Sequence, residues 1–552
     1  MRNTMHNSRC YPGFTRNALA LSVCLAGWAT QSQAAQIDLG DSDWRLRWDN
    51  TIKYSQAWRL QGADDHLTNA STAGGLYPSI QGQGDRNFSR GLVSNRLDLF
   101  SEMDLSRQNY GLRISGAAWY DDVYNKDTDD SANPHFLDDT RELHGRDAEL
   151  LDAFVFLRGD VGDTSQGTVR LGRHSLIYGE SLFYGSNGIA AAQGPTDVVK
   201  LLSVPGTQFK EILRPVNQVS GQLQINPQLS VGAYYQFEWE RSNVPGAGSY
   251  LSDNDGIGKG AGDWTEVFGN TTVHASDIEA RNSGQGGMQL RFKPEGTELE
   301  LGFYAAKYHD KTPSALYAYL DGAAAAATGL PILNAYRQVY AEDIKTVGAS
   351  FSTAYGPFNF AGETSVRWDA PLVSNLQVVT PGTAADNSGD ALYAKGKTAH
   401  VNLSTIYLLS PGTFWDGGSV LAELAWNRTL SVTDNRAALD PNTTRDATAL
   451  RVLAEPAYFQ VADGLDLSVP VGLASGWTGV RRPSAKAVSA TRHAGDWSVG
   501  VKATYLQRWD FGINYVNFFG KAAAGLREDG NFSYAQSLAD RDFVSMYVKT
   551  TF

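Results

Sequence analysis

The stretch RDFVSMYVKTTF at residues 541–552 ends the chain on an aromatic residue and alternates between two kinds of side chain. Counting back from the end, one face carries Phe552, Thr550, Val548, Met546 and Val544. Successive side chains of a strand point to opposite faces, so this pattern predicts a β-strand with one mainly apolar and one mainly polar side. Such a strand fits the closing strand of a membrane barrel and also a strand of a soluble β-sandwich.

The opposite end of the chain has the pattern of a secretory signal peptide over residues 1–34. Three arginines and no acidic residue precede a short, largely apolar run, and Ser32 and Ala34 place small residues at positions −3 and −1 of a cleavage site. Both cysteines, Cys10 and Cys24, lie within this segment. The sequence therefore predicts an exported protein whose mature chain has neither a disulfide nor a cysteine metal site.

Composition narrows the class of the remaining single domain, residues 35–552. The formal net charge of the chain is −12 and becomes more negative when the arginine-bearing leader is removed. This charge argues against nucleic acid as a partner and against an anion attracted by bulk charge. No apolar run approaches the roughly 20 residues of a membrane helix. A closed barrel also satisfies every backbone group in a bilayer, and its alternating strands keep the mean hydropathy low, here −0.31.

Alternating runs recur along the whole domain and predict about 18 antiparallel strands, within a range of about 16–20. The predicted strands cover residues 44–58, 92–105, 110–120, 150–158, 168–173, 212–225, 231–240, 288–293, 298–308, 344–354, 358–368, 397–409, 419–428, 449–460, 465–473, 497–506, 511–519 and 541–552. Several have the roughly 9–12 residues that a tilted strand needs to cross a bilayer.

The connections between these strands alternate strictly between short turns and long polar loops. Tight turns are predicted at Asn226-Pro227, Tyr355-Gly356-Pro357 and Asp463-Gly464, where turn-forming residues separate two runs. Long connections include residues 59–91 and 241–287. A soluble sandwich offers no reason for this alternation, whereas outer-membrane barrels have short periplasmic turns and long extracellular loops. The predicted fold is therefore an all-β, transmembrane outer-membrane β-barrel of a Gram-negative bacterium.

The closing strand then has a definite orientation. Its apolar face is predicted to contact lipid, with Tyr547 and Lys549 in the lumen, and its end is predicted at the periplasmic rim beside the first strand. The terminal Phe552 resembles the last residue of bacterial outer-membrane barrels, where it belongs to the assembly signal. The expected partners are outer-membrane lipid, lipopolysaccharide and the barrel assembly machinery.

A central series of motifs carries a more specific resemblance. The motifs are LGRHSLIYGES (171–181), PG (205–206), KE (210–211), PVN (215–217), YYQFEWE (234–240) and YLSDND (250–255). Their order and spacing resemble the proteobacterial outer-membrane family catalogued as domain of unknown function 1302. Residues 181–184 and 190–192 depart from the family pattern, so this loop is expected to be specialised. The resemblance implies an outer-membrane barrel, frequently encoded beside export permeases or lipid and steroid metabolism, and hence export or uptake partners. It implies no settled activity.

The connection at residues 174–211 is the least similar to a solvated loop. Its large apolar residues are Ile177, Leu182, Phe183, Ile189, Val198, Val199, Leu201, Leu202 and Val204. So much apolar surface is not expected to remain in water. We therefore expect this segment to fold into the barrel and narrow the lumen.

Charged residues of this segment are the candidate constriction residues. They are Arg173, Glu180, Asp197, Lys200, Lys210 and Glu211, and they are predicted to meet lumen-facing Gln236, Glu238 and Glu240. The alternative is a network of ion pairs that only holds the loop. Other predicted lumen-facing charges are Arg45, Arg96, Asp98, Arg113, Arg291, Glu363, Arg367 and Lys502. This mixture suits a polar path better than a packed core.

Other motifs predict less. The acidic loop at residues 121–139 could hold Ca²⁺ through its carboxylates, but its spacing matches no EF-hand and a solvated loop is the simpler interpretation. His135 and His144 lack the ligand spacing of a zinc site. The alanine-rich residues 321–333 predict a short loop helix. We predict no cofactor and no metal.

Three classes of function remain open. A barrel of this size encloses a lumen and suits a channel or transporter for small, hydrophobic or amphipathic molecules. The alternatives are an adhesin or assembly scaffold that uses the long outer loops, and an outer-membrane barrel hydrolase. For the hydrolase, the sequence has no G-x-S-x-G elbow. The adjacent His174 and Ser175 would face opposite sides of a strand, so the sequence predicts no enzyme.

Overall fold

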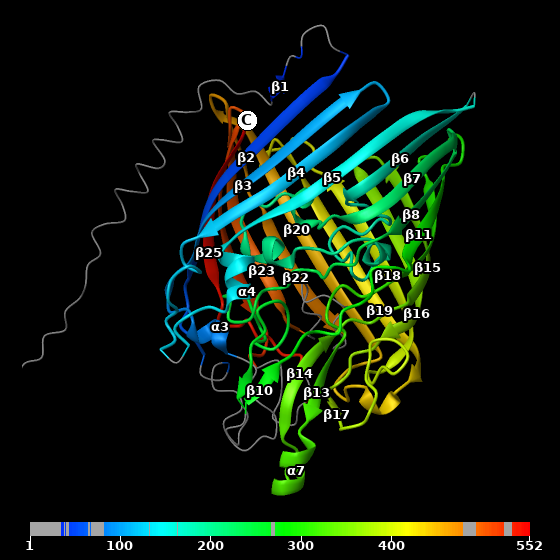
Figure 1. Cartoon of the computed structure of the whole chain (residues 1–552). Helices are drawn as coiled ribbons and strands as arrows, with labels where there is room; N and C mark the ends of the chain where they lie inside the picture. Colours follow the sequence, from blue (N-terminus) through cyan, green and yellow to red (C-terminus); the bar gives the residue numbers. More distant parts are fainter. Residues whose placement is uncertain are drawn as a thin grey trace, which may run out of the picture.

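The computed structural model describes residues 35–552 apart from positions 38, 40–42, 65–66, 68–81, 132, 163, 266–270, 479–492, 524–530 and 532. The predicted signal peptide at residues 1–34 lies outside the described residues. The rest forms one closed antiparallel barrel of 18 strands, in agreement with the prediction (Figure 1). None of the described helices is long and apolar enough to cross a membrane.

Each strand of the barrel pairs with its sequence neighbours in the barrel. The strands are β2 (Arg45–Arg59), β3 (Gly91–Arg107), β4 (Tyr110–Asp121), β5 (Arg146–Val161), β6 (Ser165–His174), β7 (Val216–Asn226), β8 (Leu229–Gln236), β11 (Gln285–Phe292), β12 (Glu300–Tyr308), β15 (Ile344–Tyr355), β16 (Phe358–Pro371), β18 (Lys395–Leu408), β19 (Gly417–Asp434), β20 (Asp446–Ala462), β21 (Leu465–Ser468) continued by β22 (Val471–Thr478), β23 (Gly495–Tyr505), β24 (Trp509–Phe519) and β25 (Phe543–Thr551). A short β1 (Ala35–Ile37) pairs with the start of β2.

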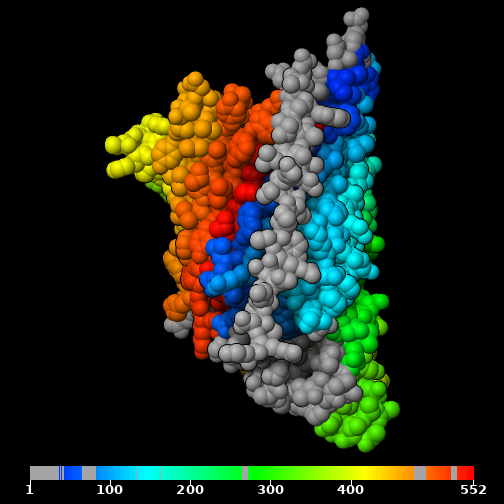
Figure 2. All heavy atoms as spheres, turned by 90° about the vertical axis from the view of Figure 1, so that its left-hand side faces the viewer, coloured from blue at the N-terminus to red at the C-terminus, as the bar shows by residue number. Residues whose placement is uncertain are grey.

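The barrel closes where the two ends of the domain meet. β2 pairs with β25 from Thr51–Thr551 to Arg59–Phe543, and Figure 2 shows the blue N-terminal strands against the red C-terminal ones. In β25, Met546 is exposed on the outer face, whereas Lys549 forms an ion pair with Asp510 at 3.3 Å. The predicted orientation of the closing strand is therefore correct.

Short turns and long loops lie at opposite ends of the barrel. In Figure 1, β1 and the C-terminus lie at the upper, short-turn end, while α3 (Gln83–Arg86) and α7 (Gly322–Thr328) lie at the lower, long-loop end. The predicted turns at Gly356 and Gly464 have positive φ values of 57° and 71°, a conformation that glycine adopts without strain. In outer-membrane barrels the short-turn end faces the periplasm and the long-loop end faces the exterior.

Several predicted strands differ from the structure in their bounds. The run predicted at 212–225 begins as a strand only at Val216, because Ile212 ends a short helix. The strand at 231–240 ends at Gln236, and Trp239 does not continue the outer face but packs on Tyr340, with ring centroids 4.9 Å apart. Glu238 and Glu240 leave the ladder because both bind Arg173. The strand at 465–473 is interrupted before β22 by Pro470, which has no N–H to donate.

A second, five-stranded sheet lies beyond the barrel at the long-loop end, at the bottom of Figure 1. It consists, in order, of β17 (Gln377–Val379), β13 (Ala315–Leu320), β14 (Leu333–Val339), β10 (Thr271–His274) and β9 (Trp264–Thr265). Tyr317, Val339 and Tyr393 are fully buried in the cluster that joins this sheet to the barrel rim. The predicted loop helix is α7, which begins after Asp321, whose carboxylate accepts the N–H groups of Ala323 and Ala324.

The acidic loop is more ordered than a solvated loop. Asp121 is buried, accepts hydrogen bonds from Ser94 Oγ and from the N–H groups of Asn95 and Val123, and Asp130 is paired with Arg86. The carboxylates are thus bound by protein donors. Among the described residues no group of three or more His, Cys, Asp or Glu is placed to hold a metal ion.

Candidate functional site

Residues 175–215, between β6 and β7, cross the interior of the barrel and are called the lumen segment below. The segment contains η2 (Ile189–Ala192), α5 (Val198–Ser203) and α6 (Phe209–Ile212). It contacts inward-facing side chains from distant parts of the wall, namely Lys53 of β2, Glu149 of β5, Glu363 of β16, Glu423 of β19 and Tyr547 of β25. The segment therefore spans the lumen instead of lying along one side.

Two wall carboxylates bind the backbone of the lumen segment. Glu423 Oε2 accepts the N–H groups of Leu182, Phe183 and Tyr184 at 3.2, 2.5 and 3.0 Å, and Asn402 Nδ2 donates to its other oxygen at 2.8 Å. Glu363 accepts the N–H groups of Glu180 and Ile189 at 2.6 and 3.0 Å. Together these hydrogen bonds attach the segment to the β16–β19 wall.

An asparagine of the segment completes this attachment. Asn187 is fully buried, donates to Asn402 Oδ1 at 2.6 Å and accepts from His400 Nδ1 and Asn427 Nδ2 at 2.9 and 3.2 Å. The guanidinium of Arg367 donates to the carbonyls of three successive residues, 186–188, at 2.8–3.1 Å. A Cβ at Gly188 would overlap Glu363 Oε1, so any larger residue here would displace this carboxylate from the segment.

The predicted constriction residues lie in or beside the segment but do not form one cluster. Arg173 forms ion pairs with Glu238 and Glu240, both at 2.9 Å, as predicted. Glu240 also binds Arg214 at 3.0 Å. Gln236 Nε2 donates to the carbonyl of Gln193, so it does contact the lumen segment.

Of the other five predicted residues, three pair with different strands and two cap helices. Glu180 binds Arg291 at 2.8 Å, Lys200 binds Glu149, and Lys210 lies 3.7 Å from Glu102. Asp197 caps α5 by accepting the N–H of Lys200 at 2.7 Å, and Glu211 caps α6. Because the segment crosses the whole lumen, Glu180, Lys200 and Lys210 each pair with the strand that lies nearest to them.

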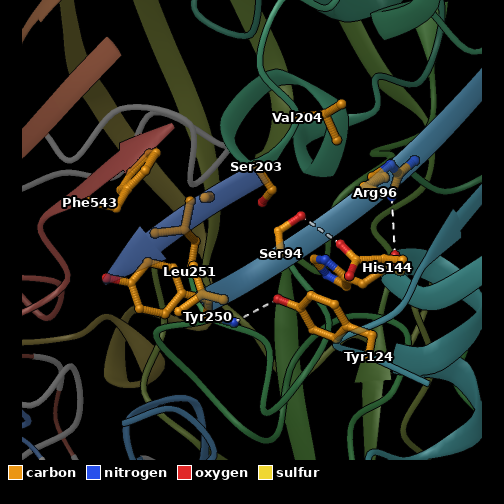
Figure 3. A pocket seen from close by; sticks show the side chains of 12 residues that line it. Ser94, Arg96, Tyr124, His144, Ser203, Val204, Tyr250, Leu251 and Phe543 are labelled. Atoms are coloured by element: carbon orange, nitrogen blue, oxygen red, sulfur yellow. Dashed lines mark hydrogen bonds between the residues drawn. The ribbon is translucent and has the colours of Figure 1, made fainter. Parts of the chain in front are cut away.

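The lumen is tightly packed beside the long-loop ends of β2, β3 and β4. There Ser203 and Val204 of the lumen segment approach Tyr250 and Leu251 of the β8–β11 loop, as Figure 3 shows, with Phe543, Tyr124 and His144 around them. The space left between these residues is about 20 Å³, which is room for about one water molecule. Nearer the short-turn end of the same strands, a space of about 440 Å³ remains beside Arg47, Arg113 and Arg158.

His144 belongs to this packed region, outside the membrane-spanning strands. Its ring stacks on Tyr124 with centroids 4.9 Å apart, and its Nε2 accepts the N–H of Gly246 at 3.1 Å. Burial and the nearby positive charge of Arg96 lower the pKa of His144 to about 3. The imidazole is therefore neutral at neutral pH.

A cavity of about 650 Å³ remains on the opposite side, between the lumen segment and strands β15–β20. Apolar side chains from both walls contribute to it, including Ile177, Leu182, Phe183, Leu201, Phe209 and Leu453. Its basic side chains are His174, Arg214, Lys311, Arg367, His400 and Arg451, against one acidic residue, Asp310. Apolar walls with a few oriented polar groups are typical of sites for small molecules.

His174 also forms a hydrogen bond that the sequence did not predict. Its Nε2 lies 2.7 Å from Ser220 Oγ on β7, and its Nδ1 lies 3.0 Å from the carbonyl of Gly172. No carboxylate of the described residues contacts this imidazole, so the pair lacks the charged third member of a catalytic triad. The pair stabilises the junction of β6 and β7.

The structure reveals anchoring residues that sequence reasoning missed: Asn187, His400, Asn402, Glu423 and Asn427. Glu363 and Arg367 were predicted only as lumen-facing charges. Polar residues at inward positions of the strands were the available signal. That signal does not say which of them bind a loop and which face open space.

Solved structures with related folds are outer-membrane channels, but the similarity is remote. OccAB2 of Acinetobacter baumannii is 9% identical with a TM-score of 0.41, and the alignment covers 92% of this chain and 98% of that one. OpdK of Pseudomonas aeruginosa, solved with vanillate, is 10% identical with a TM-score of 0.40 and coverages of 92% and 98%. The A. baumannii channel DcaP is 10% identical with a TM-score of 0.36 and coverages of 93% and 99%. We base no functional inference on them.

No curated protein sequence matches the chain. A protein-family model does match it, over residues 15–552, and includes the closed barrel, the lumen segment and the motifs that gave the resemblance. The chain therefore belongs to the family described as protein of unknown function DUF1302.

Proposed function

We propose that this protein is an outer-membrane channel for small hydrophobic or amphipathic molecules, and that the lumen segment forms its constriction. The observation that carries the proposal is the asymmetric filling of the barrel. The space beside the long-loop ends of β2–β4 is reduced to the size of a single water molecule, whereas a cavity of about 650 Å³ remains beside β15–β20. A segment that served only as a plug would have no need of such a cavity beside β15–β20.

The proposed location is the outer membrane of a Gram-negative bacterium, in contact with lipid and lipopolysaccharide after insertion by the assembly machinery. The outward-facing side chains of β5, such as Leu150, Val155 and Leu157, are apolar and more than half exposed, which suits a lipid environment. The lining of the cavity is apolar enough to hold the body of an amphipathic solute.

Planar-bilayer recording on the refolded barrel tests the channel directly. We expect discrete conductance steps from the wild type and larger steps after deletion of residues 181–202, because this deletion removes the centre of the lumen segment. Heat-modifiable mobility on a gel verifies that the deletion variant is folded. A folded barrel without conductance would exclude the channel, and equal steps from both proteins would exclude the constriction.

An adhesin or scaffold is the second candidate, and the five-stranded sheet at the long-loop end is the observation that favours it. Removing β13 to β14, residues 315–339, would abolish adhesion or partner capture if that sheet carries the function. Under the channel proposal the same deletion leaves solute flux into proteoliposomes in place. The two candidates therefore predict opposite outcomes for this variant.

A further inference from the structure

Some charged side chains around the cavity already have hydrogen-bond partners within the protein, and others do not. Glu363 and Glu423 stand on the same wall, but their carboxylate oxygens are taken by N–H groups of the lumen segment and by Asn402. Neither carboxylate lines the cavity. The wall therefore presents basic groups to an occupant and directs its acidic groups away from it.

Most of the basic groups already have partners. Arg367 donates to backbone carbonyls, Arg214 binds Glu240, and Lys311 donates to Gln285 at 2.9 Å. Burial lowers the pKa of Lys311 to about 8, so it remains mostly protonated at neutral pH. These three cations contribute to the electrostatic potential of the cavity, but their N–H donors already form hydrogen bonds or ion pairs within the protein.

Arg451 of β20 is different. Within the described part of the chain, its guanidinium has no hydrogen bond or ion pair, and it lies 5.5 Å from the centroid of the Phe183 ring. Glu423 is its cross-strand neighbour on β19, and Asp496 lies in the same row two strands away, yet neither forms an ion pair with it. A half-buried guanidinium without an acceptor retains five unused donors.

The apolar surface lies directly beside this guanidinium. Phe183 and Leu182 belong to the lumen segment, and Leu453 is the next inward-facing residue of β20 after Arg451. An occupant that reaches Arg451 with an anionic group would therefore place its adjoining carbon atoms on these side chains.

We infer that the cavity selects amphipathic monoanions, whose head group binds Arg451 and whose apolar body packs on Leu182, Phe183 and Leu453. The guanidinium fork matches a carboxylate with two parallel hydrogen bonds, which an ammonium or a neutral alcohol cannot accept in the same way. The inference rests on the proposed channel function and specifies the class of solute.

Calorimetric titration of the wild-type barrel in lipid nanodiscs tests binding without requiring transport. The probes are 4-phenylbutyrate, the matched cation 4-phenylbutylammonium, the neutral 4-phenylbutanol, and butyrate, which lacks the ring. We expect 4-phenylbutyrate to bind at least tenfold more tightly than each of the other three, after subtraction of the heats for empty nanodiscs. Equal affinities for the three phenylbutyl probes would overturn the selection for anions.

Substitutions of Arg451 test whether this residue binds the anionic head group. Arg451→Gln should reduce the affinity for 4-phenylbutyrate about tenfold and leave that for 4-phenylbutanol unchanged, and Arg451→Lys should give an intermediate loss. The matched control is Arg158→Gln, which removes the same charge from the inner face of β5, where the guanidinium lies over the Phe156 ring and outside the cavity. An equal loss in the control would assign the preference to the general potential of the lumen and overturn the role of Arg451.

Failure of the binding inference and failure of the channel proposal give different experimental results. Selective binding in nanodiscs without conductance in bilayers would refute the channel and support the binding site. Conductance without any preference among the probes would support the channel and refute the inference. If Arg451→Gln lacks heat-modifiable mobility, the comparison of the four probes on the wild type decides the question alone.

Discussion

Replacing Glu423 by alanine is expected to release the part of the lumen segment that lies on β19. The carboxylate binds three successive backbone N–H groups, those of Leu182, Phe183 and Tyr184, together with the Asn402 amide. Alanine leaves all four donors without their acceptor. The barrel wall itself should be unaffected, because the β18–β19 and β19–β20 ladders are formed by the backbone.

The size of the effect follows from the number of bonds. A buried donor left unsatisfied costs about 1–3 kcal/mol. Water can enter the enlarged space, so the lower value applies, and four donors give a loss of about 4 kcal/mol for the attached state. This loss corresponds to about three powers of ten in the ratio of attached to detached segment. Glu363 still holds the N–H groups of Glu180 and Ile189, so we expect local detachment and not complete removal.

Single-channel recording in planar bilayers is the assay. The wild type should occupy one main level, whereas Glu423→Ala should fluctuate between that level and larger ones. The double variant with Glu363→Ala should favour the larger levels further. The matched control is Glu455→Ala, an inward-facing carboxylate that binds Lys502 and Ser468 and does not contact the lumen segment. If the folded Glu423→Ala barrel records like the wild type, these carboxylates do not hold the constriction.

Three further outcomes are expected at the long-loop end. Because the pKa of His144 is about 3 in the fold against 6.5 for an ordinary histidine, its loop should be fully stable above pH 6.5 and lose stability as the pH falls toward 3. After correction for the intrinsic exchange rate, the amide protection of Gly246 should therefore be lower at pH 5 than at pH 7.5, and this difference should vanish in His144→Gln. Arg541→Met removes an ion pair with buried Asp85 and should cost on the order of 3–5 kcal/mol of local stability. Protease added to intact cells should then cleave the variant within residues 246–255. A variant that resists the protease as well as the wild type would contradict this. Asp321→Ala should remove the cap of α7 at a cost of about 1 kcal/mol, and unchanged amide exchange in residues 322–328 would contradict this.

The barrel could be predicted because each of its signals is local. Alternation is a property of neighbouring residues, and a turn such as Asp463-Gly464 depends on one glycine with φ of 71°. Eighteen such runs with alternating short and long connections fit an outer-membrane β-barrel and do not fit a soluble sandwich. Errors occurred where a tertiary contact overrode the pattern, as at Trp239, which continues the alternation in sequence but packs inward on Tyr340.

The path of the lumen segment could not be predicted in the same way. Its apolar composition indicated that it leaves water, but its anchors on Glu363 and Glu423 join residues about 170–240 positions apart. In sequence, both glutamates are ordinary inward-facing residues of strands. Whether such a residue faces solute or binds a loop depends on the course of the segment through the lumen, which no local pattern encodes.

The same point governs how the charge of this protein relates to its solute. A net charge of −12 suggests that anions are disfavoured, and for a lumen with free carboxylates this would hold. Here Glu363 and Glu423 accept N–H groups of the lumen segment and do not line the cavity, while the guanidinium of Arg451 lines it with no acceptor in the described part of the chain. The electrostatic potential inside the cavity therefore depends on which charged side chains of the wall are already bound to the lumen segment. On the proposed function, net charge would set the long-range field, and the lumen segment would set the selectivity at close range.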